Sequence, residues 1–316
     1  YAQPFVENLR SRGLETALLT FPAGEGHKTM DTVRNLYERC LQFGVDRKTP
    51  IIAYGGGVVG DVAGFVAATL LRGLPFVQAP TTVLAQVDSS IGGKVGVNLP
   101  QGKNLVGAFY QPQWVFTDTV HLETLSRSER RSGLAELVKH AVLSDGQLLT
   151  QIEAHAGSLL SGKADELKAV IGRGARIKAN VVSEDERESG RRAILNLGHT
   201  MGHAYETAAG YGKLKHGEAV ALGLRFAIAL SVHDSGLSQV DAQRINQTLD
   251  ALGLPSDWAV RTTDAVIERV GFDKKNRGDQ VNTIQLRSIE SPIIVPMTLE
   301  TFAKKARTLA QVAEEA

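Results

Sequence analysis

The segment Pro50-Ile51-Ile52-Ala53-Tyr54-Gly55-Gly56-Gly57-Val58-Val59-Gly60-Asp61 decides the fold of the first part of the chain. Its opening apolar run is typical of a parallel strand that is buried on both faces. Gly55, Gly57 and Gly60 have the spacing of a dinucleotide-binding turn, and a helix rich in small residues is expected over Val62–Leu71. A strand, a glycine turn and a helix in this order predict a nucleotide site at the helix N-terminus.

The dinucleotide-binding sequence pattern is incomplete, so a tight turn that binds no ligand remains the alternative. The acidic residue that usually follows about 20 positions later is absent, because Phe76, Val77 and Gln78 occupy that place. Asp61 also has a simpler explanation as a charge that favours the helix dipole.

Outward from this segment, strands and helices alternate, which predicts a parallel α/β sheet. The expected strands are Thr16–Phe21, Phe76–Ala79 and Trp114–Asp118. The expected helices are Pro4–Arg10 and Met30–Phe43. The expected loops are Pro22–Lys28 and a glycine-spaced stretch, Asp88–Asn98, that continues through Gly102–Asn104.

After about Leu122 long helical patterns dominate the sequence. They cover Ser126–Leu143, Gln147–Leu160, Ala164–Glu184, His199–Ala209, Gly217–His233, Ser238–Leu252 and Thr262–Val270. A hairpin of Asn282–Leu286 and Pro292–Val295 precedes a terminal helix. We expect an α/β domain with a Rossmann-like parallel sheet over residues 1–120 and a mainly α-helical domain over residues 121–316, with the active site in the cleft between them.

Composition places the chain among ordinary globular proteins. Its 316 residues are 43% hydrophobic and 22% charged, and the net charge of +1 predicts no bulk attraction to nucleic acid or to a membrane. The single cysteine, Cys40, excludes an internal disulfide and favours a cytoplasmic location. Because the chain opens at Tyr1 inside an expected helix, and a doubly wound domain should open with a strand, we expect N-terminal strands to be missing from this sequence.

The histidines of the second half suggest a metal site. His199 and His203 are four residues apart, on one face of an expected helix, and His216 follows. Two imidazoles and a carboxylate with an open position form a catalytic zinc arrangement. Glu136 is the best carboxylate, because an unpaired charge among its apolar neighbours would be costly. The glycines beside these histidines are expected to leave room for a ligand.

Other residues could supply the metal ligands, and the histidines also have a structural explanation. His140 is a competing ligand on the same helix face as Glu136, and Glu206 and Glu218 are lesser candidates. His199 and His203 could also be stacked core histidines.

Several basic and polar residues are further candidates for binding. Lys94 follows two glycines in a tightly turned apolar stretch, which favours an anion or a carboxylate as its partner, although surface lysines are the usual explanation. Arg72 closes a helix and could be a simple dipole partner. Arg192 and Asn196 are expected to point inward, whereas the charges of 184–188 are expected on a solvated face.

The chain resembles the 3-dehydroquinate synthase family across nearly its whole length. The segments that carry the resemblance are Gly24-Glu25 with Lys28, Gly55–Asp61, Pro80–Thr82, Asp88–Lys94, Gly102–Asn104, Gly133–Lys139, Arg192–His203 and Lys215–Glu218. Ala23 departs from the aspartate that is common in that family, and His140 is unusual beside the metal carboxylate.

The resemblance implies which residues bind the metal ion, the cofactor and the substrate. It implies Zn²⁺, or Co²⁺, on Glu136, His199 and His216. It implies NAD⁺ on Glu25, Lys28, Gly57, Val58, Val59, Gly60, Asp61, Thr81, Thr82, Lys94, Lys103 and Thr124. It implies a sugar-phosphate substrate on Asp88, Lys94, Asn104, Lys139, Lys178, Arg192, Asn196, His203 and either Lys274 or Lys275. Arg72 resembles the arginine that reaches the neighbouring subunit's substrate in this family, which implies a homodimer.

The implied reaction belongs to the shikimate pathway of aromatic amino-acid biosynthesis. The family converts 3-deoxy-D-arabino-heptulosonate 7-phosphate into 3-dehydroquinate and phosphate by transient oxidation, phosphate elimination, re-reduction and an intramolecular aldol step. His203 is a candidate for proton transfer or phosphate contact, since histidine titrates near neutrality. The alternatives are a valiolone or inosose type of cyclase, a metal- and NAD-dependent polyol dehydrogenase, and a non-catalytic binding module.

Overall fold

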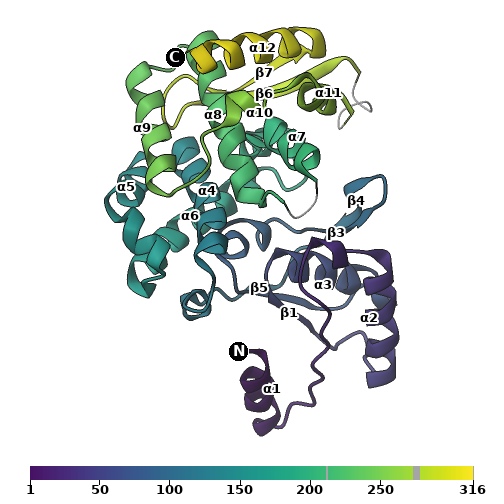
Figure 1. The fold of residues 1–316 in the computed structure, drawn as a ribbon. Coiled ribbons are helices and arrows are strands. Elements are labelled where there is room, and N and C mark those ends of the chain that lie inside the picture. The colour runs from purple at the N-terminus through teal and green to yellow at the C-terminus, as the bar shows by residue number, and fades with distance from the viewer. Residues whose placement is uncertain (211–212, 273–277, 316) are drawn as a thin grey trace. The chain divides into compact units, whose positions relative to one another are not determined.

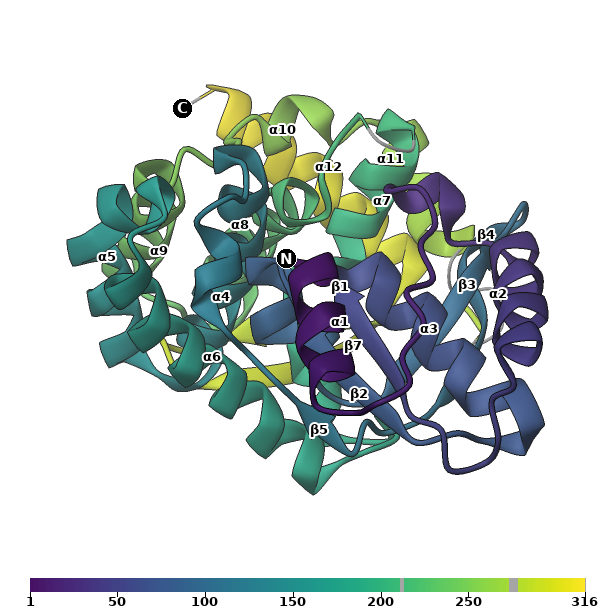
Figure 2. The same ribbon diagram turned by 90° about the horizontal axis from the view of Figure 1, so that it is seen from below.

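The computed structural model describes residues 1–210, 213–272 and 278–315, and it shows two compact units, Tyr1–Leu125 and Ser126–Ala316 (Figures 1 and 2). The first unit combines a parallel sheet with helices, and the second is built mainly from helices, so the predicted fold class is confirmed for each unit. None of the described helices has the length and apolar character needed to cross a bilayer.

A three-stranded parallel sheet in the order β1-β2-β5 organises the first unit. β1 (Ile51–Gly55) lies beside β2 (Phe76–Pro80), and β5 (Trp114–Val115) is a two-residue edge strand, shorter than predicted (Figure 2). Side chains from α2 (Met30–Phe43) and α3 (Gly57–Thr69) pack with those of the sheet into one apolar core.

The helix that follows β1 begins earlier than the sequence pattern predicted. α3 starts at Gly57, and the amide of Gly60 donates to the carbonyl of Gly56 at 3.0 Å, so Gly57–Asp61 forms the first turn of the helix and not a loop. A methyl group on Gly60 would lie 2.8 Å from Oε1 of Gln78, and one on Gly64 would overlap Val95. These two glycines let α3 pack closely enough on the sheet for the helix to begin directly at the end of β1.

An antiparallel hairpin replaces the loop that was predicted from Asp88 onward. After a π-helical turn, η3 (Ala85–Ser89), β3 (Lys94–Leu99) pairs with β4 (Gly102–Phe109). Gly96 lies opposite Gly107, and a Cβ on Gly96 would lie 2.5 Å from the carbonyl oxygen of Val106. The prediction failed because glycine usually weakens a strand, whereas here it permits the close approach of two backbones.

The predicted strand Thr16–Phe21 does not form. The Arg10 side chain donates to the Thr16 carbonyl at 2.7 and 3.1 Å, and the Arg39 side chain donates to the Thr20 carbonyl at 2.9 Å. Arginine side chains therefore take carbonyl groups that a sheet neighbour would otherwise use. The same unit also contains α1 (Ala2–Ser11), which was predicted, and three short helices, η1 (Glu25–His27), η2 (Leu70–Arg72) and η4 (Thr119–Leu122).

The second unit contains the long helices that the sequence predicted, with small shifts at their ends. They are α4 (Arg127–Ser144), α5 (Gly146–Ser161), α6 (Ala164–Glu184), α7 (His199–Ala209), α8 (His216–Asp234), α9 (Gln239–Ala251) and α11 (Asp264–Phe272). Two short helices, η5 (Arg191–Asn196) and α10 (Trp258–Arg261), were not predicted. Ser126, Asp145 and Ser238 cap α4, α5 and α9 with side-chain oxygens that accept from backbone amides three residues on.

The predicted C-terminal hairpin and helix are confirmed. β6 (Gln280–Leu286) pairs antiparallel with β7 (Pro292–Thr298), and α12 (Leu299–Glu315) packs against this hairpin and α11 (Figure 1). α4 and α8 are buried on nearly all sides, as expected for central helices, and each carries a residue of the predicted metal site.

Candidate functional site

Three side chains from three helices of the second unit converge. Glu136 lies in the middle of α4, whereas His199 and His216 are the first residues of α7 and α8. Oε1 of Glu136 lies 3.4 Å from Nε2 of His199 and 3.2 Å from Nε2 of His216. One ligand atom of each residue lies within 4.8 Å of the others, a spacing that could hold one metal ion.

The Glu136 carboxylate is fully buried on an apolar helix and has a charged partner. Nζ of Lys139, one turn further along α4 and also buried, lies 2.6 Å from Oε2 of Glu136. Burial opposes the charged form, but Lys139 and His199 outweigh it and hold the pKa of Glu136 well below its usual range. Glu136 is therefore an anion at neutral pH, as a metal ligand must be.

The two imidazoles have different environments. Burial and the nearby Lys139 lower the pKa of His199 to about 4, so this ring is neutral at pH 7. Burial also opposes the charged form of His216, but the carboxylates of Glu136 and Glu206 raise its pKa to about 9. Nδ1 of His199 faces the Leu197 carbonyl at 3.2 Å, and Nδ1 of His216 faces Oε2 of Glu206 at 3.6 Å.

Glycines beside the histidines bring the helices together, which corrects the prediction that they leave room for a ligand. A Cβ on Gly202 would lie 3.1 Å from the Ala219 carbonyl oxygen, and one on Gly198 would lie 2.8 Å from the Leu224 amide. A Cβ on Gly217 would overlap the carbonyl of Ser132, and the Gly217 amide donates to the Ser132 hydroxyl at 3.0 Å. The space beside these glycines is filled by the backbone of a neighbouring helix.

This donor set fits a divalent ion. Two imidazole nitrogens and one carboxylate oxygen are typical ligands of catalytic zinc, and Co²⁺ accepts the same ligands. His140 is fully buried one turn beyond Glu136, but the group that converges within the second unit contains His216 in its place. Glu218 pairs with Arg131 and accepts from the Lys215 amide at 3.1 Å, so its carboxylate is used at the start of α8.

Other predicted residues of the second unit lie around the histidines or on adjoining segments. The exposed His203 ring lies 5.4 Å from the His199 ring and 6.2 Å from the His216 ring, measured between centroids. Lys178 is buried on α6, and Arg192 is buried on η5, as expected for an inward side chain. Asn196 donates to Oε1 of Glu188 at 2.5 Å.

The segment before α7 is more ordered by side chains than the sequence suggested. Glu184, Glu186 and Arg187 are exposed, as predicted for a solvated face. The half-buried Glu188 accepts from Asn196, and Asp185 accepts backbone amides from Ser189, Gly190 and Arg192 at 2.9, 2.7 and 3.0 Å. These hydrogen bonds, that of Ser189 foremost, lower the pKa of Asp185 to about 2. The sequence signal for this capped turn was a carboxylate followed within a few residues by serine and glycine.

In the first unit a polar network surrounds the N-terminal turn of α3. Nζ of the buried Lys28 lies 2.5 Å from Oδ2 of Asp61 and 2.5 Å from Oδ1 of Asn104. Nδ2 of Asn98 donates to Glu25 at 2.8 Å, and Oδ1 of Asn98 accepts from the Asn104 amide at 2.9 Å. Lys103 also approaches Glu25, at 3.9 Å. The structure thus brings together residues from the loop before α2, from α3 and from the β3-β4 hairpin.

Asn98 was missed by the sequence analysis. Its signal was a polar amide directly after the buried alternation of Val95 and Val97, at the end of a strand that glycines had concealed.

The glycine turn lies at the carboxyl end of the parallel strands, where ligands of open α/β sheets bind. The Thr81 amide donates to the Gly55 carbonyl at 2.9 Å, and a Cβ on Gly56 would lie 3.1 Å from the Thr82 side chain. A Cβ on Gly57 would lie 2.9 Å from the Ser89 hydroxyl. The turns after β1 and β2 therefore meet at the start of α3.

The remaining predicted residues of the first unit are spread over other segments. Asp88 lies in η3, exposed Lys94 opens β3, and the Thr124 hydroxyl approaches the His121 carbonyl at 3.5 Å. Arg72 is exposed, and both it and Leu71 have a positive φ, of 68° and 50°. Lys274 and Lys275 lie outside the described residues.

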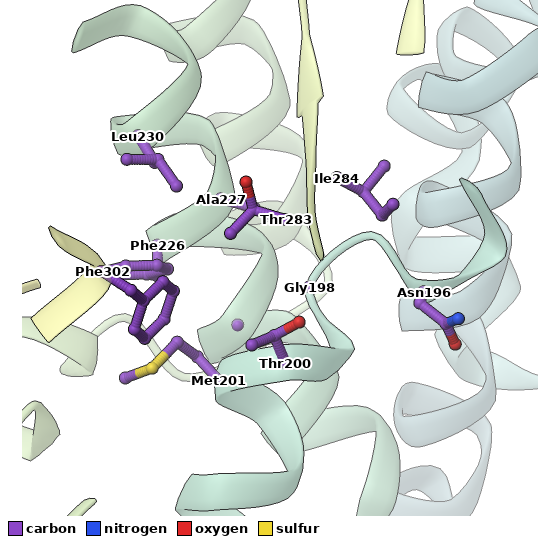
Figure 3. Close-up of a pocket in the computed structure, with 11 residues that line it drawn as sticks. Asn196, Gly198, Thr200, Met201, Phe226, Ala227, Leu230, Thr283, Ile284 and Phe302 are labelled. Atoms are coloured by element: carbon purple, nitrogen blue, oxygen red, sulfur yellow. The ribbon is translucent and has the colours of Figure 1, made fainter. Parts of the chain in front are cut away.

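A small cavity borders the N-terminus of α7 but belongs to the core (Figure 3). Its volume is about 10 Å³, close to the least that holds one water molecule. Figure 3 shows Met201, Phe226 and Phe302 together on one side of it and Asn196 on the other. Met201 follows His199 by two residues and so lies on another face of α7, which makes the cavity a packing gap and not the metal site.

The sequence is similar to known proteins along most of its length. The family model described as 3-dehydroquinate synthase N-terminal matches residues 18–132, and the model described as 3-dehydroquinate synthase C-terminal matches residues 133–276. The chain is 49% identical over 257 residues to 3-dehydroquinate synthase of Desulforamulus reducens, a match that covers 81% of this chain and 72% of that relative. It is 46% identical over 300 residues to 3-dehydroquinate synthase of Pelobacter propionicus, which covers 95% of this chain and 84% of that relative.

Solved structures with the same fold include two cyclases. A 2-epi-5-epi-valiolone synthase from Streptomyces hygroscopicus with NAD⁺ and Zn²⁺ bound has a TM-score of 0.88 and 27% identity, covering 98% of this chain and 87% of that chain. A 2-deoxy-scyllo-inosose synthase with carbaglucose-6-phosphate, NAD⁺ and Co²⁺ has a TM-score of 0.85 and 29% identity, covering 97% and 86%. Glycerol dehydrogenase from Schizosaccharomyces pombe, at 17% identity and a TM-score of 0.68 over 99% and 81%, shares the fold alone.

Proposed function

Because the chain belongs to the 3-dehydroquinate synthase family, we propose that it converts 3-deoxy-D-arabino-heptulosonate 7-phosphate into 3-dehydroquinate and inorganic phosphate. The observation that carries this proposal is the convergence of Glu136, His199 and His216 within the helical unit. The reaction breaks a carbon–oxygen bond and releases phosphate, so the enzyme would be a lyase of the shikimate pathway.

The chain's residues fit the two groups that the cyclase structures contain. The valiolone synthase holds NAD⁺ and Zn²⁺ and the inosose synthase holds NAD⁺ and Co²⁺, and we infer NAD⁺ and one such ion for this chain. When bound, NAD⁺ supplies a hydride acceptor and the ion supplies Lewis acidity toward substrate hydroxyls. Glu136, His199 and His216 would hold the ion, with the carboxylate already anionic and the His199 ring already neutral.

The dinucleotide would bind at the start of α3. The backbone of Gly57–Asp61 and the helix N-terminus favour the pyrophosphate there, and the turn of Thr81 and Thr82 borders the same place. The Lys28 network with Glu25, Lys103 and Asp61 adds polar groups around it. Lys94 and Thr124 complete the proposed set.

The substrate's phosphate and carboxylate would be held by cations and amides. The proposed set is Lys94, Asn104, Lys139, Lys178, Arg192, Asn196 and Lys274, with Asp88 for hydroxyl groups. His203 is exposed beside the other two rings, which suits it to accept or deliver a proton at a ring nitrogen.

Arg72 supports a homodimer. Arg72 is exposed and is the second of two consecutive residues with positive φ, after Leu71, a strained arrangement that ordinary helix ends avoid. We propose that this conformation directs the guanidinium toward the substrate phosphate of a neighbouring subunit. Sedimentation equilibrium of the protein would show a dimer if this is correct.

The test is a paired assay with the heptulosonate phosphate, NAD⁺ and Zn²⁺. We expect equal amounts of phosphate and dehydroquinate and no accumulation of NADH, because the overall reaction is redox-neutral. NADH that accumulates with turnover would instead indicate a dehydrogenase. Turnover of a different sugar phosphate in preference to the heptulosonate would indicate a valiolone or inosose type of cyclase, which the lower identities to those enzymes do not favour.

A further inference from the structure

Glu206 is a buried carboxylate that the proposed reaction does not use. It lies on α7 seven positions after His199 and three after His203, so it projects from the same face as both rings. Its Oε2 is 3.6 Å from Nδ1 of His216, across the contact between α7 and α8. A buried carboxylate is costly unless it has a charged or polar partner, and the His216 ring is such a partner.

The two imidazoles of the cluster are held in parallel ways but by groups of different charge. Each turns Nε2 toward Oε1 of Glu136 and Nδ1 away from it. The Nδ1 of His199 faces the neutral carbonyl of Leu197, whereas the Nδ1 of His216 faces the anionic Glu206. A histidine that binds a metal through one nitrogen normally has its other N–H held by such an acceptor, and a carboxylate makes the ring a stronger ligand than a carbonyl does.

We propose that Glu206 is a positioning residue for the metal site: it keeps the His216 ring protonated on Nδ1 with Nε2 directed at the ion, and its charge strengthens that ligand. The inference rests on the proposed metal site. A second nearby carboxylate, Glu218, is closer to His216 in the sequence but faces Arg131 and the Lys215 amide, so it offers a matched control.

The experiment measures the Zn²⁺ affinity of the apoprotein by competition with a chromophoric chelator. We expect Glu206→Gln to weaken Zn²⁺ binding by about 10- to 100-fold, the usual effect of losing such an outer partner. Glu218→Gln should leave the affinity at the wild-type value. The visible absorption of the Co²⁺-loaded protein should shift in Glu206→Gln and not in Glu218→Gln, because only the former changes a ligand's donor strength.

Thermal unfolding of the metal-free proteins separates positioning from folding. Apo Glu206→Gln should unfold at the wild-type temperature; if it does not fold, Glu206→Asp, which keeps the charge but withdraws it by one methylene, should still show weaker binding than wild type. Wild-type affinity in these variants, or an equal loss in Glu218→Gln, would overturn the inference. Failure of the wild-type protein to bind Zn²⁺ would instead refute the proposed metal site.

Discussion

The two units hold their polar clusters by different means. In the helical unit, Glu136, His199 and His216 stand on helices whose backbones meet at glycines, such as Gly217 on α8 against Ser132 on α4. In the α/β unit, the Lys28 network joins a loop, a helix start and a hairpin mostly through side chains. The first arrangement is fixed by main-chain packing, and the second by polar pairs that already satisfy one another.

This difference indicates how each cluster would receive its ligand. The helical cluster presents converging nitrogen and oxygen atoms to an ion with little change in structure. If the dinucleotide binds as proposed, the network around α3 would exchange some of its present pairs, such as Lys28 with Asp61, for contacts to it. We therefore expect substitutions in the helical unit to act on metal content or stability, and those in the network to act on cofactor affinity.

The largest effect is expected from His199→Ala. Loss of one of three ligands should abolish stoichiometric zinc and lower turnover on the order of a thousandfold, since the ion contributes several kcal/mol to catalysis. Atomic absorption and the phosphate-release assay measure both. His233→Ala, which removes an exposed histidine paired with Asp234 in the same unit, is the control. A fully metallated and active His199→Ala enzyme would contradict the ligand assignment.

The next effect tests whether backbone contact holds the helical cluster. Gly223→Ala places a methyl group onto the Gly198 carbonyl between α8 and α7, and such overpacking should destabilise the unit by about 3 kcal/mol. Gly172→Ala, within α6 and with no atom near its Cβ, should instead be neutral or stabilising by up to about 1 kcal/mol. Thermal unfolding compares the two. Equal stability of both variants would show that α7 and α8 do not depend on this contact.

Much of the helical unit could be predicted from its sequence, because helical periodicity and caps are local signals. α6 and α7 have the predicted bounds, as does α2 in the other unit. Glu136 was also identifiable, since a lone carboxylate among apolar helical residues demands a partner. The groups that face Nδ1 of the two histidines were not identifiable, because ring orientation decides them and the partner of His216 lies on another helix.

The α/β unit was harder to predict because its glycines have more than one explanation. Gly96 and Gly107 concealed the hairpin, and with it Asn98 at the centre of the polar network. The sequence likewise predicts that glycines beside His199 and His216 leave space for a ligand, whereas in the structure they allow helices to touch. A glycine indicates that another group approaches the backbone closely, but only the fold identifies whether that group is a ligand, a strand or a helix.

A third prediction separates the network from the metal cluster. Lys28→Met removes a buried ammonium that pairs with Asp61 and Asn104, and NAD⁺ binding should weaken about 10- to 100-fold, as expected for one hydrogen bond to a charged group. The Zn²⁺ affinity should stay at the wild-type value. Calorimetric titration of NAD⁺ measures the effect, and the exposed Lys48→Met variant is the control. Unchanged NAD⁺ affinity in Lys28→Met would remove Lys28 from the proposed cofactor site.

The smallest effect concerns a segment of the helical unit that is held by hydrogen bonds to a side chain, as the α/β network is. Asp185 accepts the amides of Ser189, Gly190 and Arg192 in the segment before α7, and these bonds lower its pKa to about 2. A carboxylate whose pKa is lowered by folding stabilises the protein above its unfolded pKa of about 3.9, and this stabilisation is lost as the pH falls toward 2.

Asp185→Asn should therefore unfold at a slightly lower temperature than wild type at pH 7 and pH 5, with the difference shrinking below about pH 4. Glu184→Gln, which removes the adjacent carboxylate that pairs with Arg191, is the control and should show no such convergence. Thermal unfolding at pH 7, 5, 4 and 3 measures both variants. A difference between Asp185→Asn and wild type that stayed constant down to pH 3 would mean that the charge of Asp185 does not hold this segment. The helical unit would then depend on backbone packing even here, and the contrast with the α/β unit would be sharper than the contacts suggest.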